Sequence, residues 1–307
     1  MKIIFIHGMN QQNYNAAALK QHWIDIFNQG LHYAQIPMSA TDFDIEMAYY
    51  ADLLLSYQST KLVSPARSAT LSAHAPQVPP DPAELYLYAP MQWLLNDQTD
   101  SKAQTAIPLL PQFLKQAHPD FPTRLSAYAA LLKDHLFKDL ASLLDHFPNI
   151  HAHLIHEFLL ETYLYLSDNE FMQAVHQRIQ ACFDPNQTHL IVAHSLGSVI
   201  AYNFLHQYPQ YHVDGFISLG SPLAFRVIQE KIYQPISAPN NLKGDWINFF
   251  STEDFLTAFP LTNPPFDFSP PILNQAIQTF SHQPHQITGY LQHPNVIKNI
   301  VKIVKKA

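Results

Sequence analysis

The segment that most constrains this chain is 193–197, Ala-His-Ser-Leu-Gly, because it joins two apolar stretches of different kinds. Residues 188–193 form a short apolar run typical of a buried strand, and residues 198–205 carry an apolar pattern typical of a helix. A tight turn between strand and helix needs small residues two before and two after its serine, and the segment has Ala and Gly there. This spacing makes Ser195 a candidate nucleophile, although serine is also favoured at a helix N-cap.

A second strand pattern lies at the start of the chain. Residues 3–6 are β-branched or aromatic, and the run ends abruptly at the His-Gly pair of residues 7–8. Apolar residues at helical spacing follow in 14–31, where Gly30 indicates the end of the helix, and strand-like residues come next in 44–50. Two strands separated by one helix predict a parallel sheet.

The alternation of strands and helices is interrupted in the middle of the chain. Residues 56–82 are rich in Ser, Ala and Pro and predict an irregular stretch, and mostly helical patterns follow. We therefore expect a core made of residues 1–51 and 184–307, with a largely helical insertion at 52–183, part of which flanks the sheet.

Four histidines and one glutamate lie close together within this insertion. They are His146, His151, His153, His156 and Glu157. None of the tight zinc spacings is present, so we expect surface and packing roles and no metal site.

Candidate acids and bases follow the serine segment. Strand patterns at 212–219 and 245–251 lead into Ser221 and into the adjacent Glu253 and Asp254. Loops at the carboxyl ends of parallel strands carry the chemistry of such sheets, so Asp254 is the candidate acid, with Glu253 as the alternative. A turn or helix-capping role is the competing interpretation of Asp254.

The candidate base lies in the polar segment 281–290. His285 fits this role best, and His282 is the alternative. His293, which precedes Pro294, is expected to open an amphipathic terminal helix.

Together these segments resemble the α/β-hydrolase superfamily in its lipase and esterase branch. The resemblance rests on the serine turn at 193–197, the His-Gly pair after an early strand, and the order serine, acid, histidine along the chain. It covers residues 1–50 and 185–307. The fold that it implies is an α/β-hydrolase fold, a mainly parallel sheet flanked by helices, with a helical cap insertion.

The resemblance also implies roles for individual residues. Ser195 would attack a carbonyl carbon, His285 would take its proton and return it to the leaving group, and Asp254 would hold the imidazole. The amides of Met9 and Leu196 would form the oxyanion hole. The residues expected at the substrate-binding site are His7, Gly8, His194 and Ser221.

The activity that the resemblance implies is hydrolysis of a carboxylic ester, from a small-molecule or lipid-like acyl substrate. A thioesterase, an amidase or an acyltransferase would use the same nucleophile. A binding module without catalysis could also retain this fold, because fold alone does not establish activity. The sequence gives no indication of the oligomeric state.

Composition argues against several other classes of protein. A net charge of −7, with a local basic stretch only at 298–306, predicts no nucleic-acid binding. The seven glycines form no phosphate-binding loop, so we expect no nucleotide cofactor. No apolar run reaches the length of a membrane span, and the run at 3–6 is too short for a signal peptide, which predicts a cytoplasmic protein. The single Cys182 is expected to be a buried, unreactive thiol.

Overall fold

The computed structural model describes residues 1–9, 11–53, 136, 140, 161–254, 257, 259–262, 264–280 and 283–306. Contacts within the chain divide it into two compact units. One consists of Met1–Asp52 with Asn169–Ala307 and contains the sheet, and the other is Leu53–Asp168. The predicted irregular stretch at 56–82 and the cluster of His146, His151, His153, His156 and Glu157 lie outside the described residues.

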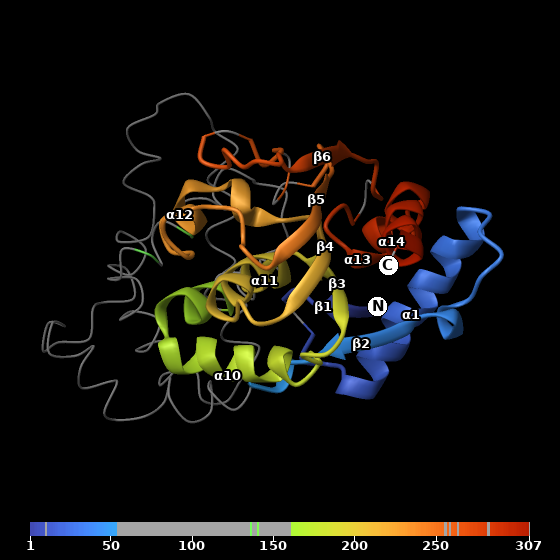
Figure 1. The fold of residues 1–307 in the computed structure, drawn as a ribbon, viewed down its shortest axis with the longest axis horizontal. Helices are drawn as coiled ribbons and strands as arrows, with labels where there is room; N and C mark the ends of the chain where they lie inside the picture. The colour runs from blue at the N-terminus through green and yellow to red at the C-terminus, as the bar shows by residue number, and fades with distance from the viewer. Residues whose placement is uncertain are drawn as a thin grey trace, which may run out of the picture. The chain divides into compact units, whose positions relative to one another are not determined.

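The sheet has six strands, all parallel (Figure 1). The sequence predicts a mainly parallel sheet, and a strand pattern marks each of the first five strands. They are β1 (Lys2–Ile6), β2 (Asp44–Ala48), β3 (Thr188–His194), β4 (His212–Leu219), β5 (Leu242–Phe250) and β6 (Leu273–Ala276). Their order in space is β2-β1-β3-β4-β5-β6, so the direction of strand addition reverses between β1 and β3. In sheets of this kind, such a reversal leaves a crevice at the carboxyl ends of the two strands.

Helices cover both faces of the sheet (Figure 1). The helices α1 (Ala16–Tyr33), α13 (Ile287–Leu291) and α14 (Pro294–Lys306) lie together on one face, and α10 (Asn169–Gln180) and α11 (Leu196–Gln207) lie on the other. Three short helical turns lie in the loops, η1 (Ala40–Asp42), η3 (Pro222–Ala224) and α12 (Arg226–Gln229). The protein therefore has an α/β fold, and α10, within the predicted insertion, belongs to the unit that contains the sheet.

The central strands are buried on both faces because their sequences are continuous apolar runs. Residues Ile3 to Ile6 of β1 are all fully buried, and β1 pairs with β2 on one side and β3 on the other. Alternate side chains such as Phe5 and Val192 pack with Trp23 and Ile297 in one core beneath α1 and α14. Burial on both faces is the expected state of a parallel strand between two layers of helices.

The prediction that the first helix ends at Gly30 is wrong, because α1 continues to Tyr33. A Cβ on Gly30 would lie 2.6 Å from Cγ1 of Ile297 and 2.9 Å from Cα of Gln292. The glycine therefore allows the C-terminal residues to approach α1 closely, and its role is in packing between helices.

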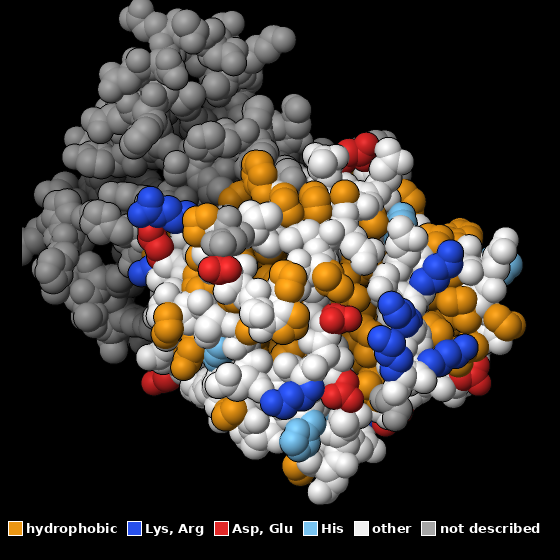
Figure 2. Space-filling model, turned by 45° about the horizontal axis from the view of Figure 1, so that its top comes forward, with side chains coloured by type: hydrophobic (Ala, Val, Ile, Leu, Met, Phe, Trp, Pro, Cys, Tyr) orange, Lys and Arg blue, Asp and Glu red, His pale blue; other side chains and the backbone are white. Residues whose placement is uncertain are grey.

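The predicted amphipathic terminal helix is confirmed as α14. Its apolar residues, including Val296 and Ile300, are buried in the core, whereas Lys298 and Lys302 are exposed. Figure 2 shows several Lys and Arg side chains gathered on one side of the described surface and others spread over the rest of this view. Among the described residues, no helix has the length and apolar character needed to cross a bilayer.

Candidate active site

Ser195 lies in the tight turn between β3 and α11. Its backbone has φ 52° and ψ −128°, a conformation that costs a non-glycine residue about 1–3 kcal/mol. The turn is held by the Ser195 amide, which donates to the Leu219 carbonyl at 2.9 Å, and by the Ser198 hydroxyl, 2.6 Å from the Ser195 carbonyl oxygen. Ser195 occupies the N-cap position, yet its side chain makes no capping hydrogen bond. The strained backbone therefore directs Oγ elsewhere.

Two glycines allow this turn to lie against the end of β1. A Cβ on Gly197 would overlap the carbonyl oxygen of His7 and lie 2.6 Å from that of Ile6. A Cβ on Gly8 would lie 2.8 Å from Cβ of Ser195. The small residues that the spacing predicts are thus required by a direct contact between the β1 loop and the start of α11.

The side chains of Ser195, His285 and Asp254 form one hydrogen-bonded path. Nε2 of His285 lies 2.7 Å from Oγ of Ser195, and Nδ1 of His285 lies 2.8 Å from Oδ2 of Asp254. Because a carboxylate only accepts, Nδ1 carries the proton and Nε2 is free to accept from the serine hydroxyl. Chemically, such a path can remove the serine proton during nucleophilic attack and stabilise the resulting imidazolium.

These three residues reach one another from separate loops. Ser195 follows β3, Asp254 follows β5, and His285 precedes α13. All three loops follow the carboxyl ends of strands or lie beside them. The sequence predicts the reactive residues at this edge of the sheet. The structure thus brings together the three residues predicted as nucleophile, acid and base.

Asp254 is fully buried and is held by several donors. Burial by itself would raise its pKa, but the charge of His285 and hydrogen bonds from His285, Tyr290 and Thr257 lower the pKa below its usual value. The hydroxyl of Tyr290 donates to Oδ2 of Asp254 at 2.6 Å. Asp254 is therefore an ionised carboxylate in the interior, and its side chain bonds His285 instead of capping a turn.

His194, one of the predicted substrate-binding residues, is buried against His285. Its Nε2 lies 3.0 Å from the carbonyl oxygen of His285, so this nitrogen carries the proton. Burial, followed by the charge of His285, lowers the pKa of His194 to about 3. A neutral His194 thus positions the backbone of the loop that carries His285.

His7 is also engaged inside the protein. Its Nδ1 donates to the Gly8 carbonyl at 2.6 Å, and its Nε2 accepts from the Tyr50 amide at 3.1 Å. The Tyr50 ring stacks on the imidazole with centroids 3.9 Å apart. Burial lowers the pKa of His7 to about 4. His7 is thus neutral and fixes the loop in which Gly8 meets Ser195.

Ser221 follows β4 and is buried beside the start of α11. Its Oγ lies 2.7 Å from Oγ of Ser198 and accepts a hydrogen bond from the Leu223 amide at 3.3 Å. The hydroxyl therefore connects the β4 loop to the serine turn. The substrate-binding roles of Ser221, His194 and the His7-Gly8 pair stay predictions.

The two predicted oxyanion donors lie near Ser195. Leu196 is the first residue of α11, so its amide has no acceptor within the helix. Met9 is buried, follows the glycine that meets Ser195, and accepts at its carbonyl from Nε2 of Gln11 at 2.9 Å. The role of these amides stays a prediction.

The alternative candidates for the acid and the base lie in different surroundings. Glu253 is exposed, while the adjacent Asp254 faces His285. His282 lies outside the described residues. His293 directly precedes α14, and its Nδ1 accepts from the Asn295 amide at 3.2 Å, so its predicted place at the start of this helix is confirmed.

The sequence reasoning assigned no role to Tyr290, Thr257 or Ser198, although each bonds a residue of the site. Thr257 Oγ1 lies 2.9 Å from the Tyr290 hydroxyl, and Ser198 bonds the serine turn. For Thr257 and Ser198, the available signal in the sequence was proximity, because Thr257 is three residues after Asp254 and Ser198 is three residues after Ser195.

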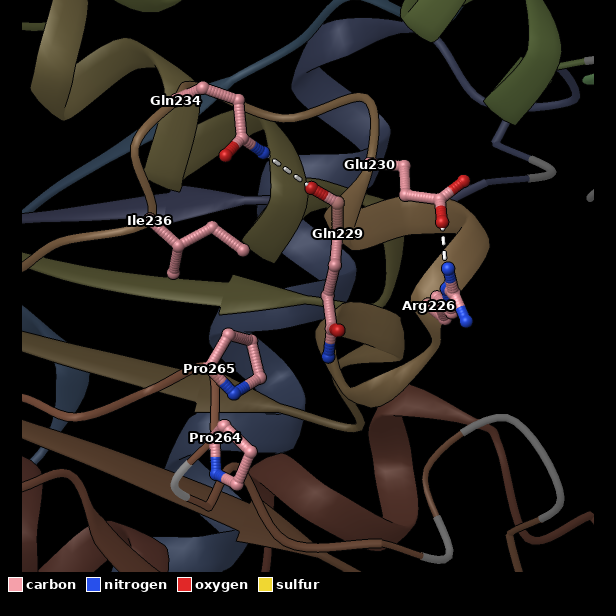
Figure 3. A pocket seen from close by; sticks show the side chains of 7 residues that line it. All are labelled: Arg226, Gln229, Glu230, Gln234, Ile236, Pro264 and Pro265. Carbon is pink, nitrogen blue, oxygen red and sulfur yellow. Dashed lines mark hydrogen bonds and ion pairs between the residues drawn. The ribbon is translucent and has the colours of Figure 1, made fainter.

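Other residues form a shallow groove of about 560 Å³ (Figure 3). It is lined by Arg226, Gln229, Glu230, Gln234, Ile236, Pro264 and Pro265. Arg226 forms an ion pair with Glu230 at 2.7 Å, and Nε2 of Gln234 donates to the Gln229 carbonyl at 2.6 Å. None of the predicted site residues lines this groove.

Within the residues that the structure describes, no three His, Cys, Asp or Glu side chains gather closely enough to hold a metal ion. The fold and site define an α/β protein with a six-stranded parallel sheet and a partly buried Ser-His-Asp hydrogen-bond path. A scan against protein-family models gives no match for the chain, and a search of curated proteins gives none.

Proposed function

We propose that this protein is a serine hydrolase of the α/β-hydrolase type that cleaves carboxylic esters. The observation that carries the proposal is the path from Ser195 Oγ through His285 to Asp254 Oδ2, with distances of 2.7 and 2.8 Å. A nucleophile, a base within hydrogen-bond reach, and a group that orients the base are the parts that nucleophilic acyl transfer requires.

The position of Ser195 in the sheet supports the same proposal. Ser195 follows β3 and Gly8 follows β1, the two strands between which the strand order reverses. Ligands of doubly wound sheets bind outside the carboxyl ends of the strands at this point. The strained backbone of Ser195 also has the geometry of a nucleophile turn between a strand and a helix.

In the proposed reaction, Oγ of Ser195 attacks the ester carbonyl carbon while Nε2 of His285 takes the hydroxyl proton. The negative charge on the carbonyl oxygen is stabilised by the amides of Leu196 and Met9, the first of which lies at the positive end of α11. The tetrahedral intermediate collapses to an acyl-enzyme, and His285 returns the proton to the departing alcohol. Water, activated by His285, then releases the acid. Asp254 holds the imidazole and stays ionised throughout.

The experiment is covalent labelling with a fluorophosphonate, followed by mass spectrometry of the modified peptide. We expect the native protein to be modified at Ser195 and Ser195→Ala to be unmodified, with ester turnover lowered about 10⁴-fold or more. Ser218→Ala is a matched control, because Ser218 is equally buried in β4 but bonds Asn248 and Trp246. Absence of labelling in the folded native protein would contradict the proposal and favour a binding module.

A further inference from the structure

Oδ2 of Asp254 accepts hydrogen bonds from two different side chains. His285 Nδ1 lies at 2.8 Å and the Tyr290 hydroxyl at 2.6 Å. A single carboxylate oxygen thus divides its charge between the imidazole and a phenol. Hydrogen bonds to an ionised acceptor are stronger than neutral ones, so the second donor competes for electron density that would otherwise stabilise His285 when it is charged.

Tyr290 is built to donate and not to ionise. Its side chain is fully buried, and burial together with the charge of Asp254 raises its pKa strongly. Oγ1 of Thr257 lies 2.9 Å from the Tyr290 hydroxyl and gives it a second partner. The phenol therefore keeps its proton across the pH range in which enzymes work.

The packing around Tyr290 leaves its hydroxyl little freedom. Tyr290 lies in α13 and belongs to the core beneath α1 and α14. Gly220, with φ +56°, follows β4, and a Cβ there would lie 3.1 Å from the Tyr290 ring and 3.3 Å from Oδ2 of Asp254. The residue that follows β4 thus packs closely against both members of the Tyr290–Asp254 pair, and a Cβ at position 220 would require one of them to shift by a few tenths of an ångström.

We propose that Tyr290 is a positioning residue for the reaction proposed above. Its hydroxyl holds Oδ2 of Asp254 toward His285 Nδ1 and takes part of the carboxylate charge. By doing so, it limits how strongly Asp254 stabilises the imidazolium that forms when His285 takes the proton of Ser195. The inference rests on the proposed hydrolase activity, since it concerns the base of that reaction.

The other described titratable groups around His285 do not modulate the charge of Asp254 as Tyr290 does. From the end of β3, His194 lies with its ring centroid 5.0 Å from that of His285 and 5.8 Å from that of Tyr290. His194 is neutral, with a pKa of about 3, and His7 lies beyond it with a pKa of about 4. Glu253 is exposed. Among the described residues facing the imidazole, Asp254 thus supplies the negative charge, and Tyr290 modulates it.

The test is the pH profile of kcat/KM for Tyr290→Phe, which keeps the ring and removes the hydroxyl. We expect kcat/KM at neutral pH to fall about 10-fold, because one hydrogen bond to a charged group is lost. We expect the acidic limb of the profile to move to higher pH by about half a unit or more, because Asp254 then favours the imidazolium more strongly. If Tyr290 acted only in packing, the substitution would lower kcat/KM at every pH and would leave the acidic limb of the profile at the same pH.

Tyr202→Phe is the matched control. Tyr202 is also fully buried, and its hydroxyl bonds the Ser237 carbonyl at 3.2 Å, away from Asp254. This variant loses a buried phenol without touching the carboxylate, so its acidic limb should coincide with that of the native protein. A shift in both variants would overturn the inference, since it would trace the effect to general loosening.

A second substitution keeps the inference testable if Tyr290→Phe does not fold. Replacing Tyr290 by 3-fluorotyrosine retains the hydroxyl and makes it a stronger donor, so the acidic limb should move to lower pH. If ester turnover and Ser195 labelling persist but neither substitution moves the acidic limb of the kcat/KM profile, the proposed role of Tyr290 is overturned. Failure of the hydrolase proposal itself would give a different result, because the native protein would then show neither ester turnover nor labelling.

Discussion

Replacing Gly197 by alanine tests whether the contact between α11 and the end of β1 holds the serine turn. A Cβ at this position would overlap the carbonyl oxygen of His7 and lie 2.6 Å from that of Ile6, whereas real Cβ atoms essentially never come within 3.0 Å of such neighbours. Both neighbours are backbone atoms at the end of a buried strand. The clash can be relieved only if β1 and α11 move apart.

Two effects of opposite sign determine the size of the change. Alanine in place of glycine inside a helix contributes up to about 1 kcal/mol of stability. Overpacking a close contact costs about 1–3 kcal/mol, and a contact with immobile backbone belongs at the upper end of this range. We therefore expect Gly197→Ala to lower the free energy of unfolding by about 2 kcal/mol.

Gly215→Ala is the matched control for this substitution. The atoms nearest to a Cβ on Gly215 would be side-chain methyl carbons of Leu190 and Ile303, at 3.0 and 3.1 Å, and these side chains can shift more easily than the backbone. We expect this variant to lose less than about 1 kcal/mol. The measurement is urea unfolding at neutral pH, followed by tryptophan fluorescence, with the rate of fluorophosphonate labelling measured on the folded proteins.

The labelling rate connects this packing to the proposed chemistry. Separation of β1 from α11 would also separate Gly8 from Ser195, so Gly197→Ala should label more slowly than Gly215→Ala. The reasoning is refuted if Gly197→Ala is as stable as the native protein and labels at the native rate. Equal destabilisation of the two variants would also contradict it, because backbone and side-chain neighbours would then be equivalent.

Three further predictions follow from the site and its surroundings. Asp254→Asn should lower kcat/KM for an ester about 10⁴-fold, because the imidazole loses its orienting anion, and an effect as large in Glu253→Gln would contradict the choice of acid. His285→Ala should abolish labelling while His282→Ala retains it, and the reverse result would move the base to His282. Burial lowers the pKa of His176 to about 4, so the unfolded state binds more protons than the folded state below pH ~6.5. The free energy of unfolding should therefore fall by about 1.4 kcal/mol per unit for this histidine as the pH is lowered from 6.5 to 4, and His176→Gln should reduce the measured slope by that amount.

The central strands could be predicted from the sequence because burial on both faces leaves a continuous apolar run. β1 and β3 show this pattern, and each is followed at once by polar or small residues that end the strand. The serine turn could be predicted for a related reason, since the close contact at Gly197 restricts which residues can stand there.

β6 lacked such a pattern and was not predicted. Its sequence is Leu-Asn-Gln-Ala, and Leu273 is 41% exposed at the edge of the sheet. The strand is held instead by polar contacts, because Asn248 in β5 donates to Oδ1 of Asn274 at 3.0 Å and Nδ2 of Asn274 donates to the Leu261 carbonyl at 2.8 Å. Hydrogen bonds between residues distant in the chain leave no periodic trace in the local sequence.

At the site, the choice between Glu253 and Asp254 also depends on contacts with distant residues, which the local sequence does not reveal. The two carboxylates are adjacent, and either could be reached by a nearby histidine on sequence grounds alone. Burying an ionised carboxylate is costly unless donors surround it, and two donors to Asp254, His285 and Tyr290, come from the loop before α13 and from α13 itself. Tyr290 is at the same time a core residue beneath α1 and α14 and a donor to Asp254. Packing of the C-terminal helices on the sheet therefore stabilises the carboxylate at position 254, so formation of this layer of the core and assembly of the Ser-His-Asp path share the contacts of Tyr290.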